Sequence, residues 1–485
     1  MKRKTLITFL AAITAVTCSF GLVACDGNDG NDENDGHVHD YVASVVEPTC
    51  TEQGYTLHTC KDCDENYKDN YVNALNHDLQ HHAAQTATCR NVGWQAYDVC
   101  SRCDYSTYEE IAKIEHSYSN YICTTCYSVD PAAPDTEGLE FTLNDDGTSY
   151  TLSGRGTAAG NYLKIPAEYN GKPVTEIGED AFNSYGNFVA IHLPDGIQTI
   201  GSAAFIANES LKSLTIPDSV TQLCESAFDY CISLEWVSFG KGLSAIGDGA
   251  FFECTALTSV EFPENINQIG IIAFAGCNKL TVKISVNITE IGGGAFNGCE
   301  ILLDENNKNY TMVDGVLFNS DKTKLICYGG DNTRTSYTVP DGVTICGYAF
   351  AFTPLETIIV PEGITEIGGD AFFSCESLTN IKLPNTLKYI GDSAFEGCSS
   401  IESIVIPDGV TEIGGDAFTD CDSLKTVTFP NSLTKIGPFL FDWCYSFNEV
   451  IFKGTIDQWN AIEKLSPWAG TSGFIIRCND GNVNV

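Results

Sequence analysis

The sequence predicts a β-rich solenoid, a stack of short repeated coils, over more than half of its 485 residues. An Ala-Phe pair recurs at spacings of 22 or 23 residues with one gap, and Ile-Gly and cysteine positions keep the same period. A repeat of this length buries its apolar face only against its neighbours, so the coils must stack around one shared core. The pairs are Ala181-Phe182, Ala204-Phe205, Ala227-Phe228, Ala250-Phe251, Ala273-Phe274, Ala295-Phe296, Ala349-Phe350, Ala371-Phe372, Ala394-Phe395, Ala417-Phe418 and the variant Leu440-Phe441.

Residues 1–24 have the pattern of a secretory signal peptide, in which three basic residues precede a short apolar stretch. The sequence Leu-Val-Ala-Cys at 22–25 resembles the bacterial lipobox, which implies cleavage before Cys25 and lipidation of its thiol. The alternative is a plain signal peptide cut near the same place, and both predict export. Residues 25–36 then give the lipidated cysteine and a solvated acidic tether. We expect a protein anchored by lipid on the extracellular face of the cell membrane.

The charge balance restricts the classes of partner. The formal net charge is −38, whereas nucleic acid and anionic lipid bind cationic protein faces. We therefore expect no nucleic-acid partner, and membrane contact only through the N-terminal anchor. Acidity of this size favours solubility and self-repulsion, and we expect a monomer.

The segment between the tether and the solenoid concentrates cysteine and histidine in a second repeat of 38 or 39 residues. Each unit contains a Cys-x-x-Cys pair, the spacing at which two thiolates reach one tetrahedral ion. Cys50 with His39 or His77 would complete a Cys₃His set around the first pair. Cys89 with His77 or His116 would complete a set around the second pair, and the third unit is truncated. Within residues 37–129 the candidate ligands are His39, Cys50, Cys60, Cys63, His77, Cys89, Cys100, Cys103, His116, Cys123 and Cys126.

A bound metal or a disulfide is expected to stabilise these modules, because about 38 residues cannot bury enough apolar surface to fold alone. Structural zinc explains why histidine accompanies cysteine. Disulfides, which are common in exported proteins, are the alternative to zinc. The third possibility is that these cysteines are free thiols. The role is structural in every case, since a closed four-ligand site leaves no position for a substrate.

The remaining segments follow from turn and strand signals. Residues 130–137, rich in proline and acids, are expected to be a linker. Residues 138–165 contain two alternating apolar stretches around an Asp-Gly turn, which predicts a hairpin that caps the stack. The solenoid spans 166–452, in about 12 coils, and 453–485 forms the C-terminal cap.

One coil, residues 378–398, illustrates the repeat. Its first six residues end in apolar-polar-apolar alternation and Pro384 follows, which predicts a short strand. Gly391 is expected to permit a backbone conformation that a side chain would resist. Ala394 is small where coils approach, and Phe395 is expected to join an aromatic spine.

This repeat resembles the BspA-type, or Treponema-type, bacterial leucine-rich repeat, of form LxxIxIPxxVTxIGxxAFxxC. The match covers about residues 166 to 452. The resemblance implies a cell-surface or secreted protein, often used in adhesion, and it implies no catalytic residues. The Cys/His-rich segment resembles spacer modules near the N-terminus of some surface proteins of anaerobic Gram-positive bacteria.

Two features of the repeat array raise functional questions. Between Ala295 and Ala349 an insertion near 304–330 is read as one irregular coil with a protruding loop, either a recognition feature or a tolerated insertion. The second feature is a ladder of cysteines, each of which follows a repeat phenylalanine by three residues. We expect buried thiols there rather than disulfides, because parallel stacking aims the Cβ vectors the same way. The ladder comprises Cys231, Cys254, Cys277, Cys299, Cys375, Cys398, Cys421 and Cys444.

The function expected from the sequence is binding rather than catalysis. The sequence has no GxSxG, HExxH or phosphate-loop motif, so we expect no enzyme and no cofactor for the solenoid. The leading hypothesis is adhesion to a protein or glycan on host or microbial surfaces. The alternatives are an architectural spacer and, less favoured, a surface hydrolase. Trp236, on an otherwise Ser/Thr/Glu/Lys strand face, is the candidate binding residue.

Overall fold

The computed structural model describes residues 38–184, 188–330, 333–470 and 472–485. The predicted signal, Cys25 and the tether lie outside them. The chain divides into two compact units, Met1–His116 and Ser117–Val485. Within the described residues no helix is long and apolar enough to cross a membrane.

The first unit is built from small antiparallel sheets. In its first module, β1 pairs with β2 from Tyr41 opposite Cys60 to Val46 opposite Tyr55, and β3 pairs with β2. The second module pairs β4 with β6 and β5 with β7. The strands are β1 (Tyr41–Val46), β2 (Gly54–Cys60), β3 (Asn66–Val72), β4 (Leu79–His82), β5 (Gly93–Trp94), β6 (Tyr97–Cys100) and β7 (Glu110–Ile111).

The second unit begins with the truncated third module, a short hairpin of β8 (Tyr118–Ser119) and β9 (Ile122–Cys123). Ile122 and Ala133 are buried in one small cluster with Ala190 of the solenoid. The ammonium of Lys164 donates to the backbone oxygens of Pro131 and Ala133 at 2.9 and 2.7 Å. Residues 130–137, expected to be a linker, therefore pack along the first coils, because backbone carbonyls there meet a lysine of the solenoid.

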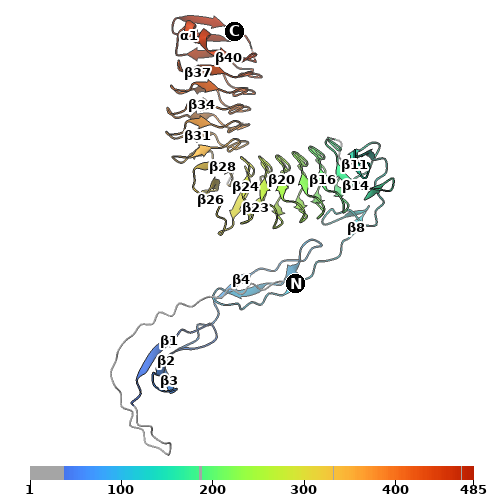
Figure 1. Cartoon of the computed structure of the whole chain (residues 1–485), viewed down its shortest axis with the longest axis vertical. Coiled ribbons are helices and arrows are strands. Elements are labelled where there is room, and N and C mark those ends of the chain that lie inside the picture. Colours follow the sequence, from blue (N-terminus) through green and yellow to red (C-terminus); the bar gives the residue numbers. More distant parts are fainter. Residues whose placement is uncertain (1–37, 185–187, 331–332, 471) are drawn as a thin grey trace, which may run out of the picture. The chain divides into compact units, whose positions relative to one another are not determined.

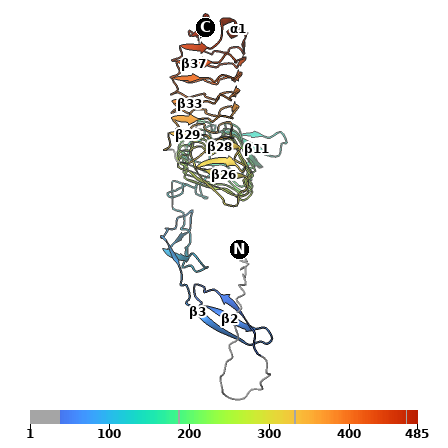
Figure 2. The same cartoon turned by 90° about the vertical axis from the view of Figure 1, so that its left-hand side faces the viewer.

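The solenoid places one short strand of each coil in a parallel row. The first row runs β12 (Tyr162–Lys164), β15 (Ala190–His192), β17 (Ser213–Thr215), β19 (Trp236–Ser238), β21 (Ser259–Glu261), β23 (Thr281–Ile284) and β25 (Glu300–Leu303). After an interruption it resumes as β29 (Ser336–Thr338), β31 (Thr357–Ile359), β33 (Asn380–Lys382), β35 (Ser403–Val405), β37 (Thr426–Phe429), β39 (Glu449–Phe452) and β41 (Ile475–Cys478). We call residues 139–303 the first arm and residues from 333 onward the second arm (Figures 1 and 2).

Two-residue strands form a second row where each coil returns. In the first arm they are β14 (Lys172–Ile177, the longer first member), β16 (Thr199–Ile200), β18 (Gln222–Leu223), β20 (Ala245–Ile246), β22 (Gln268–Ile269) and β24 (Glu290–Ile291). In the second arm they are β30 (Thr344–Ile345), β32 (Glu366–Ile367), β34 (Tyr389–Ile390), β36 (Glu412–Ile413), β38 (Lys435–Ile436) and β40 (Glu463–Lys464).

The repeat phenylalanines form the predicted aromatic spine. Phe182 and Phe205 stack with ring centroids 5.1 Å apart and planes within 2°, and Phe372 and Phe395 stack at 5.2 Å. These rings are fully buried, and burial of one such side chain contributes roughly 1.5–3 kcal/mol. The fold class expected from the Ala-Phe period is confirmed.

The cysteine ladder is buried, and it does more than fill space. Each thiol donates to the backbone oxygen of the repeat phenylalanine one coil earlier, as Cys398 does to Phe372 at 3.2 Å and Cys254 to Phe228 at 3.3 Å. Where the ladder has no cysteine, the buried Asn208 donates its side-chain N–H to the backbone oxygen of Phe182 at 3.1 Å. In these coils the position therefore holds a buried side chain that donates a hydrogen bond to the preceding coil.

The conformational role expected for Gly391 is wrong. Its φ is not positive; instead, a Cβ there would lie 2.5 Å from the backbone nitrogen of Gly369 in the preceding coil. The residue is glycine because adjacent coils approach closely. Left-handed backbone occurs just before Ala and two residues after Phe, at Ser393 (φ 53°) and Gly397 (φ 71°) in this coil.

The insertion near 304–330 is not a protruding loop. It forms an antiparallel meander of β26 (Tyr310–Val313), β27 (Val316–Asn319) and β28 (Lys324–Tyr328). Leu317 packs into the core of the first arm, whereas Val316 and Phe318 pack into the core of the second. Because alternate strand residues face opposite sides, β27 separates two cores, and the stack turns at this point (Figure 1).

The two ends of the stack are closed by added strands. β10 (Glu140–Leu143) and β11 (Tyr150–Gly154) form a hairpin, and β11 pairs in parallel with β14; β13 (Glu168–Tyr169) also pairs with β14. At the far end, α1 (Ile456–Ala461) follows a capping box at Thr455, and β42 (Gly481–Asn484) pairs with β41. The row of one strand per coil begins at β12 and ends at β41, within the two segments expected to be caps, so the array has about 14 turns rather than 12.

Candidate functional sites

The interior of the first unit consists mainly of cysteine. Among described residues 38–116, the buried apolar side chains are Cys50, Cys60, Ala87, Cys89 and Cys100. Valine, leucine and isoleucine side chains of the same segment are largely exposed. This unit therefore has thiols where a domain of ordinary composition has aliphatic side chains.

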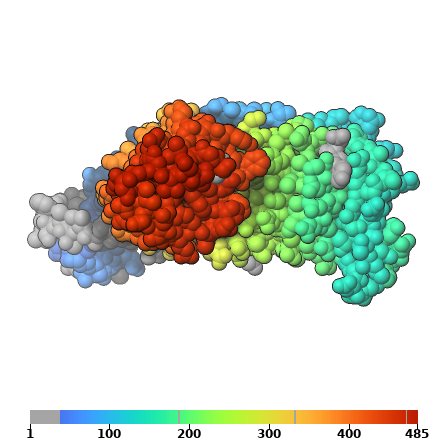
Figure 3. Space-filling view, turned by 90° about the horizontal axis from the view of Figure 1, so that it is seen from above, coloured from blue at the N-terminus to red at the C-terminus, as the bar shows by residue number. Residues whose placement is uncertain are grey.

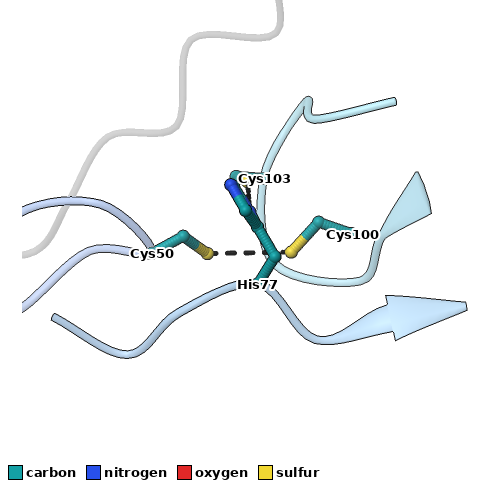
Figure 4. Close-up of side chains that lie close together, drawn as sticks. All are labelled: Cys50, His77, Cys100 and Cys103. Carbon is teal, nitrogen blue, oxygen red and sulfur yellow. Dashed lines mark hydrogen bonds between the residues drawn. The ribbon is translucent and has the colours of Figure 1, made fainter. Parts of the chain in front are cut away.

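Cys50, His77, Cys100 and Cys103 converge, with one ligand atom from each lying within 4.8 Å of the others. Figure 4 shows them arriving from the loop after β1, the segment before β4, the end of β6 and the turn that follows it. The sulfurs of Cys50 and Cys100 lie 3.7 Å apart, and the sulfur of Cys103 lies 3.3 Å from Nδ1 of His77. We call these four residues the inter-module cluster.

A second cluster joins His39, Cys60 and Cys63, whose ligand atoms also lie within 4.8 Å of one another. The sulfur of Cys63 is 3.3 Å from Nδ1 of His39. Within the first unit Cys89 and His116 likewise come together. The third pair, Cys123 and Cys126, is buried in the second unit, and its ligand set stays a prediction.

The grouping of Cys50 with Cys60 and Cys63 is wrong. Cys60 pairs with Tyr41 at one end of the β1–β2 hairpin, whereas Cys50 lies in the loop at the other end. Five residue steps of about 3.4 Å separate these ends by about 17 Å. The chain leaves the first module at the Cys50 end, where the N–H of Leu75 donates to the backbone oxygen of Thr49 at 2.9 Å, and His77 follows directly.

The surroundings shift the pKa values of the two buried thiols of the inter-module cluster in opposite directions. Burial and the neighbouring Cys103 and Cys100 raise the pKa of Cys50 to about 11. Burial also opposes the thiolate of Cys100, but the backbone N–H of Arg102, 3.4 Å away, and the side chain of His77 outweigh it. The pKa of Cys100 is lowered to about 6. The cluster thus already stabilises one thiolate by hydrogen bonds.

The donor set fits a tetrahedral zinc ion. Zinc–sulfur and zinc–nitrogen bonds of about 2.3 and 2.05 Å place two sulfurs about 3.8 Å apart, and a sulfur about 3.6 Å from a nitrogen. The corresponding separations here are 3.7 and 3.3 Å. A disulfide requires a sulfur separation of about 2.05 Å, and no disulfide joins the cysteines of the described residues.

Trp236, the binding residue expected from the sequence, is half-buried in β19. Its strand neighbours at the same position are Ser213 and Ser259. These small neighbours leave room for the indole of Trp236 to lie over them. The position therefore suits an indole that covers its neighbouring strands as well as one that contacts a partner.

A more exposed aromatic group lies on the last regular coil. Phe439, Trp443 and Tyr445 are 39%, 57% and 76% exposed, and the rings of Trp443 and Tyr445 meet edge to face at 6.4 Å. We call these three residues the C-terminal aromatic patch; the C-terminal coils are red and nearest the viewer in Figure 3. Ser374, Gly397 and Asp420 stand where Trp443 does in the three preceding coils, whereas Tyr230 and Phe352 stand there in coils farther away.

Known solved structures resemble a large part of this chain, and no curated protein matches it. Its solved structural neighbours include a leucine-rich cell surface protein from Faecalibacterium prausnitzii A2-165, at 29% identity over 71% of this chain and 99% of that one, with TM-score 0.49. They also include the pneumococcal vaccine antigen PcpA, at 22% identity over 71% and 93%, TM-score 0.47. A leucine-rich repeat protein from Eubacterium ventriosum matches at 23% over 71% and 83%, TM-score 0.42.

The model of the BspA type leucine-rich repeat region matches residues 175–302 and 343–462 in six copies. The matched segments end and resume on either side of the meander, where the coil pattern is interrupted. Both the match and the stacked parallel coils support one assignment. The chain belongs to the BspA-type leucine-rich repeat family of bacterial surface proteins.

Proposed function

We propose that this protein is an adhesin held at the cell surface through a lipid on Cys25, and that its second arm binds a protein partner. The observation that carries the proposal is the C-terminal aromatic patch. Exposed Trp and Tyr side chains supply large contact area at low entropic cost and dominate many protein interfaces. Among the described aromatic side chains of the solenoid, those of Tyr445 and Trp443 are the two most exposed.

The backbone at the patch supports a role in contact rather than in folding. Phe439 and Trp443 have left-handed φ values of 56° and 57°. This conformation suits glycine, asparagine and aspartate, and it is strained for bulky side chains. The preceding coil places Asp416 and Asp420 at the same two positions. Tyr348 and Phe352 occupy them in an earlier coil, but there both rings pack against Phe373. Aromatic residues that stay exposed at strained positions contribute little to stability, which is typical of functional sites.

The charge around the patch favours a basic partner. Asp420 is flanked by Asp422 and Asp442; partial burial, together with these neighbouring carboxylates, raises its pKa. Closely spaced acids beside exposed aromatic rings suit lysine and arginine side chains, which pair with carboxylates and stack on indole faces. The net charge of −38 attracts such a partner from a distance.

The proposal is tested by binding to immobilised protein with purified extracellular-matrix proteins and cell-wall polysaccharide as probes. We expect a matrix protein with a basic surface to be retained, and Trp443→Ala with Tyr445→Ala to weaken retention at least tenfold. Trp236→Ala is the matched control, an indole in the first arm. Loss with Trp236→Ala alone would move the site to β19. Retention of polysaccharide instead would make the ligand a glycan, and retention of no probe would favour the spacer role.

The lipid anchor has its own test. We expect the native protein to partition with membranes and to incorporate labelled fatty acid, and Cys25→Ala to incorporate none. Mass spectrometry of the mature N-terminus should find Cys25 first, carrying a diacylglyceryl group. A mature chain that begins elsewhere without lipid would leave export by a plain signal peptide.

A further inference from the structure

We propose that Cys50, His77, Cys100 and Cys103 bind one zinc ion that joins the two modules of the first unit to each other. Cys50 belongs to the first module, residues 38–76, and the other three ligands belong to the second, residues 77–115. The metal is therefore shared across a module boundary, in contrast to the closed set within one module that the repeat spacing suggests (Figure 4).

The boundary is already shaped to hold this site. The N–H of Leu75 donates to the backbone oxygen of Thr49, next to Cys50, at 2.9 Å. The guanidinium of Arg102, between Cys100 and Cys103, donates to the backbone oxygen of Asn76, next to His77, at 2.9 Å. Arg102 thus bonds across the boundary beside Cys103 and His77, and the Leu75–Thr49 bond holds the end of the first module beside Cys50, as outer-shell contacts of metal ligands commonly do.

The second boundary repeats the first, which argues that the arrangement is built into the module. The N–H of Ile114 donates to the backbone oxygen of Thr88 at 3.1 Å, which is the Leu75–Thr49 bond shifted by 39 residues. Cys89 follows Thr88 as Cys50 follows Thr49, and it lies close to His116. Each module's loop cysteine therefore meets the histidine that opens the next module.

Zinc is the ion that this donor set favours. Three thiolates and one imidazole at tetrahedral separations match structural zinc sites, in which all four positions are filled by protein. Carboxylates, which calcium and magnesium require, are absent from the four ligands. Because the buried apolar side chains of this unit are mostly ligands, the energy that orders the boundary comes chiefly from the metal.

The test measures zinc bound to the full mature chain by mass spectrometry of metals, with cysteine substitutions made in two backgrounds. We expect Cys50→Ala to remove one equivalent of zinc. In a Cys103→Ala background the same substitution should remove no further zinc, because the inter-module site is already lost. In a Cys63→Ala background it should still remove one equivalent of zinc. The reverse pattern would assign Cys50 to the Cys60 and Cys63 cluster and overturn the inter-module site. Cys478→Ala, outside all clusters, is the control and should leave the zinc content unchanged.

A second measurement separates loss of a ligand from loss of folding. Cys50→His keeps a zinc ligand at the same place, so the metal should remain. In the cobalt-substituted protein, the thiolate-to-cobalt charge-transfer absorbance should fall by one thiolate of three at this site. An unchanged spectrum, iron or copper in place of zinc, or a peptide in which Cys50 and Cys100 are joined by a disulfide would each refute the proposal.

Discussion

Replacing Cys398 distinguishes a thiol that donates a hydrogen bond from one that only fills space. The side chain is fully buried and donates to the backbone oxygen of Phe372 at 3.2 Å. Alanine deletes the sulfur, comparable to a methylene group, at a cost of about 1 kcal/mol. It also deletes a hydrogen bond with a net contribution of about 1 kcal/mol. We expect Cys398→Ala to lower the free energy of unfolding of the second arm by about 2 kcal/mol.

Serine provides the decisive comparison. A hydroxyl keeps the donor, so Cys398→Ser should cost only about 1 kcal/mol, less than alanine. If the thiol were a filler, the buried hydroxyl would make serine at least as damaging as alanine. Urea denaturation followed by tryptophan fluorescence measures this, since three of the five tryptophans lie in the second arm: Trp443, Trp459 and Trp468. Serine equal to or worse than alanine would refute the hydrogen-bond reasoning, and Cys478→Ala should change the midpoint little.

Two further predictions concern the packing and charge of the solenoid. Gly391→Ala should destabilise the second arm by about 2 kcal/mol or more, because the added Cβ meets backbone of the neighbouring coil; Gly342→Ala, with φ 74° and no atom within 4 Å of the new Cβ, should cost about 1 kcal/mol. Thermal unfolding measures both, and equal losses would contradict the close-approach argument. Burial, with the charge of Glu253 adding to it, raises the pKa of Asp229 from 3.8 to about 7, so the folded state holds this proton more tightly than the unfolded state, and stability falls as pH rises from about 4 to 7. Asp229→Asn should therefore raise the unfolding temperature relative to the parent more at pH 8 than at pH 5, and a difference independent of pH would exclude this carboxyl as the cause.

The Ala-Phe period could predict the coil because every periodic residue faces the core. Phe395 and Cys398 are buried as expected, since burial depends on the position of a residue within its own coil. Gly391 was assigned the wrong reason because its constraint comes from the adjacent coil, and the period does not encode the distance between coils. The meander was missed because Leu317 and Val316 face two different cores, and one strand pattern does not reveal which core each face meets.

The ligand residues of the first unit could be found from spacing, but their partners could not. Cys-x-x-Cys and the histidine that precedes it lie at one end of a hairpin, where the sulfur of Cys63 is 3.3 Å from Nδ1 of His39, one of the two histidines that the spacing allowed. Cys50 lies one strand length away, and only the path of β3 back to that end takes His77 there. Strand pairing, which is a long-range property, therefore decides whether Cys50 lies beside the ligands of the first module or of the second.

The strand β27, shared by two cores, also couples the two arms. Leu317 covers the last coil of the first arm, while Val316 and Phe318 cover the first coil of the second arm from the opposite side of the strand. Loss of this one strand would therefore expose apolar surface on both arms at once, because each arm uses it to close an end.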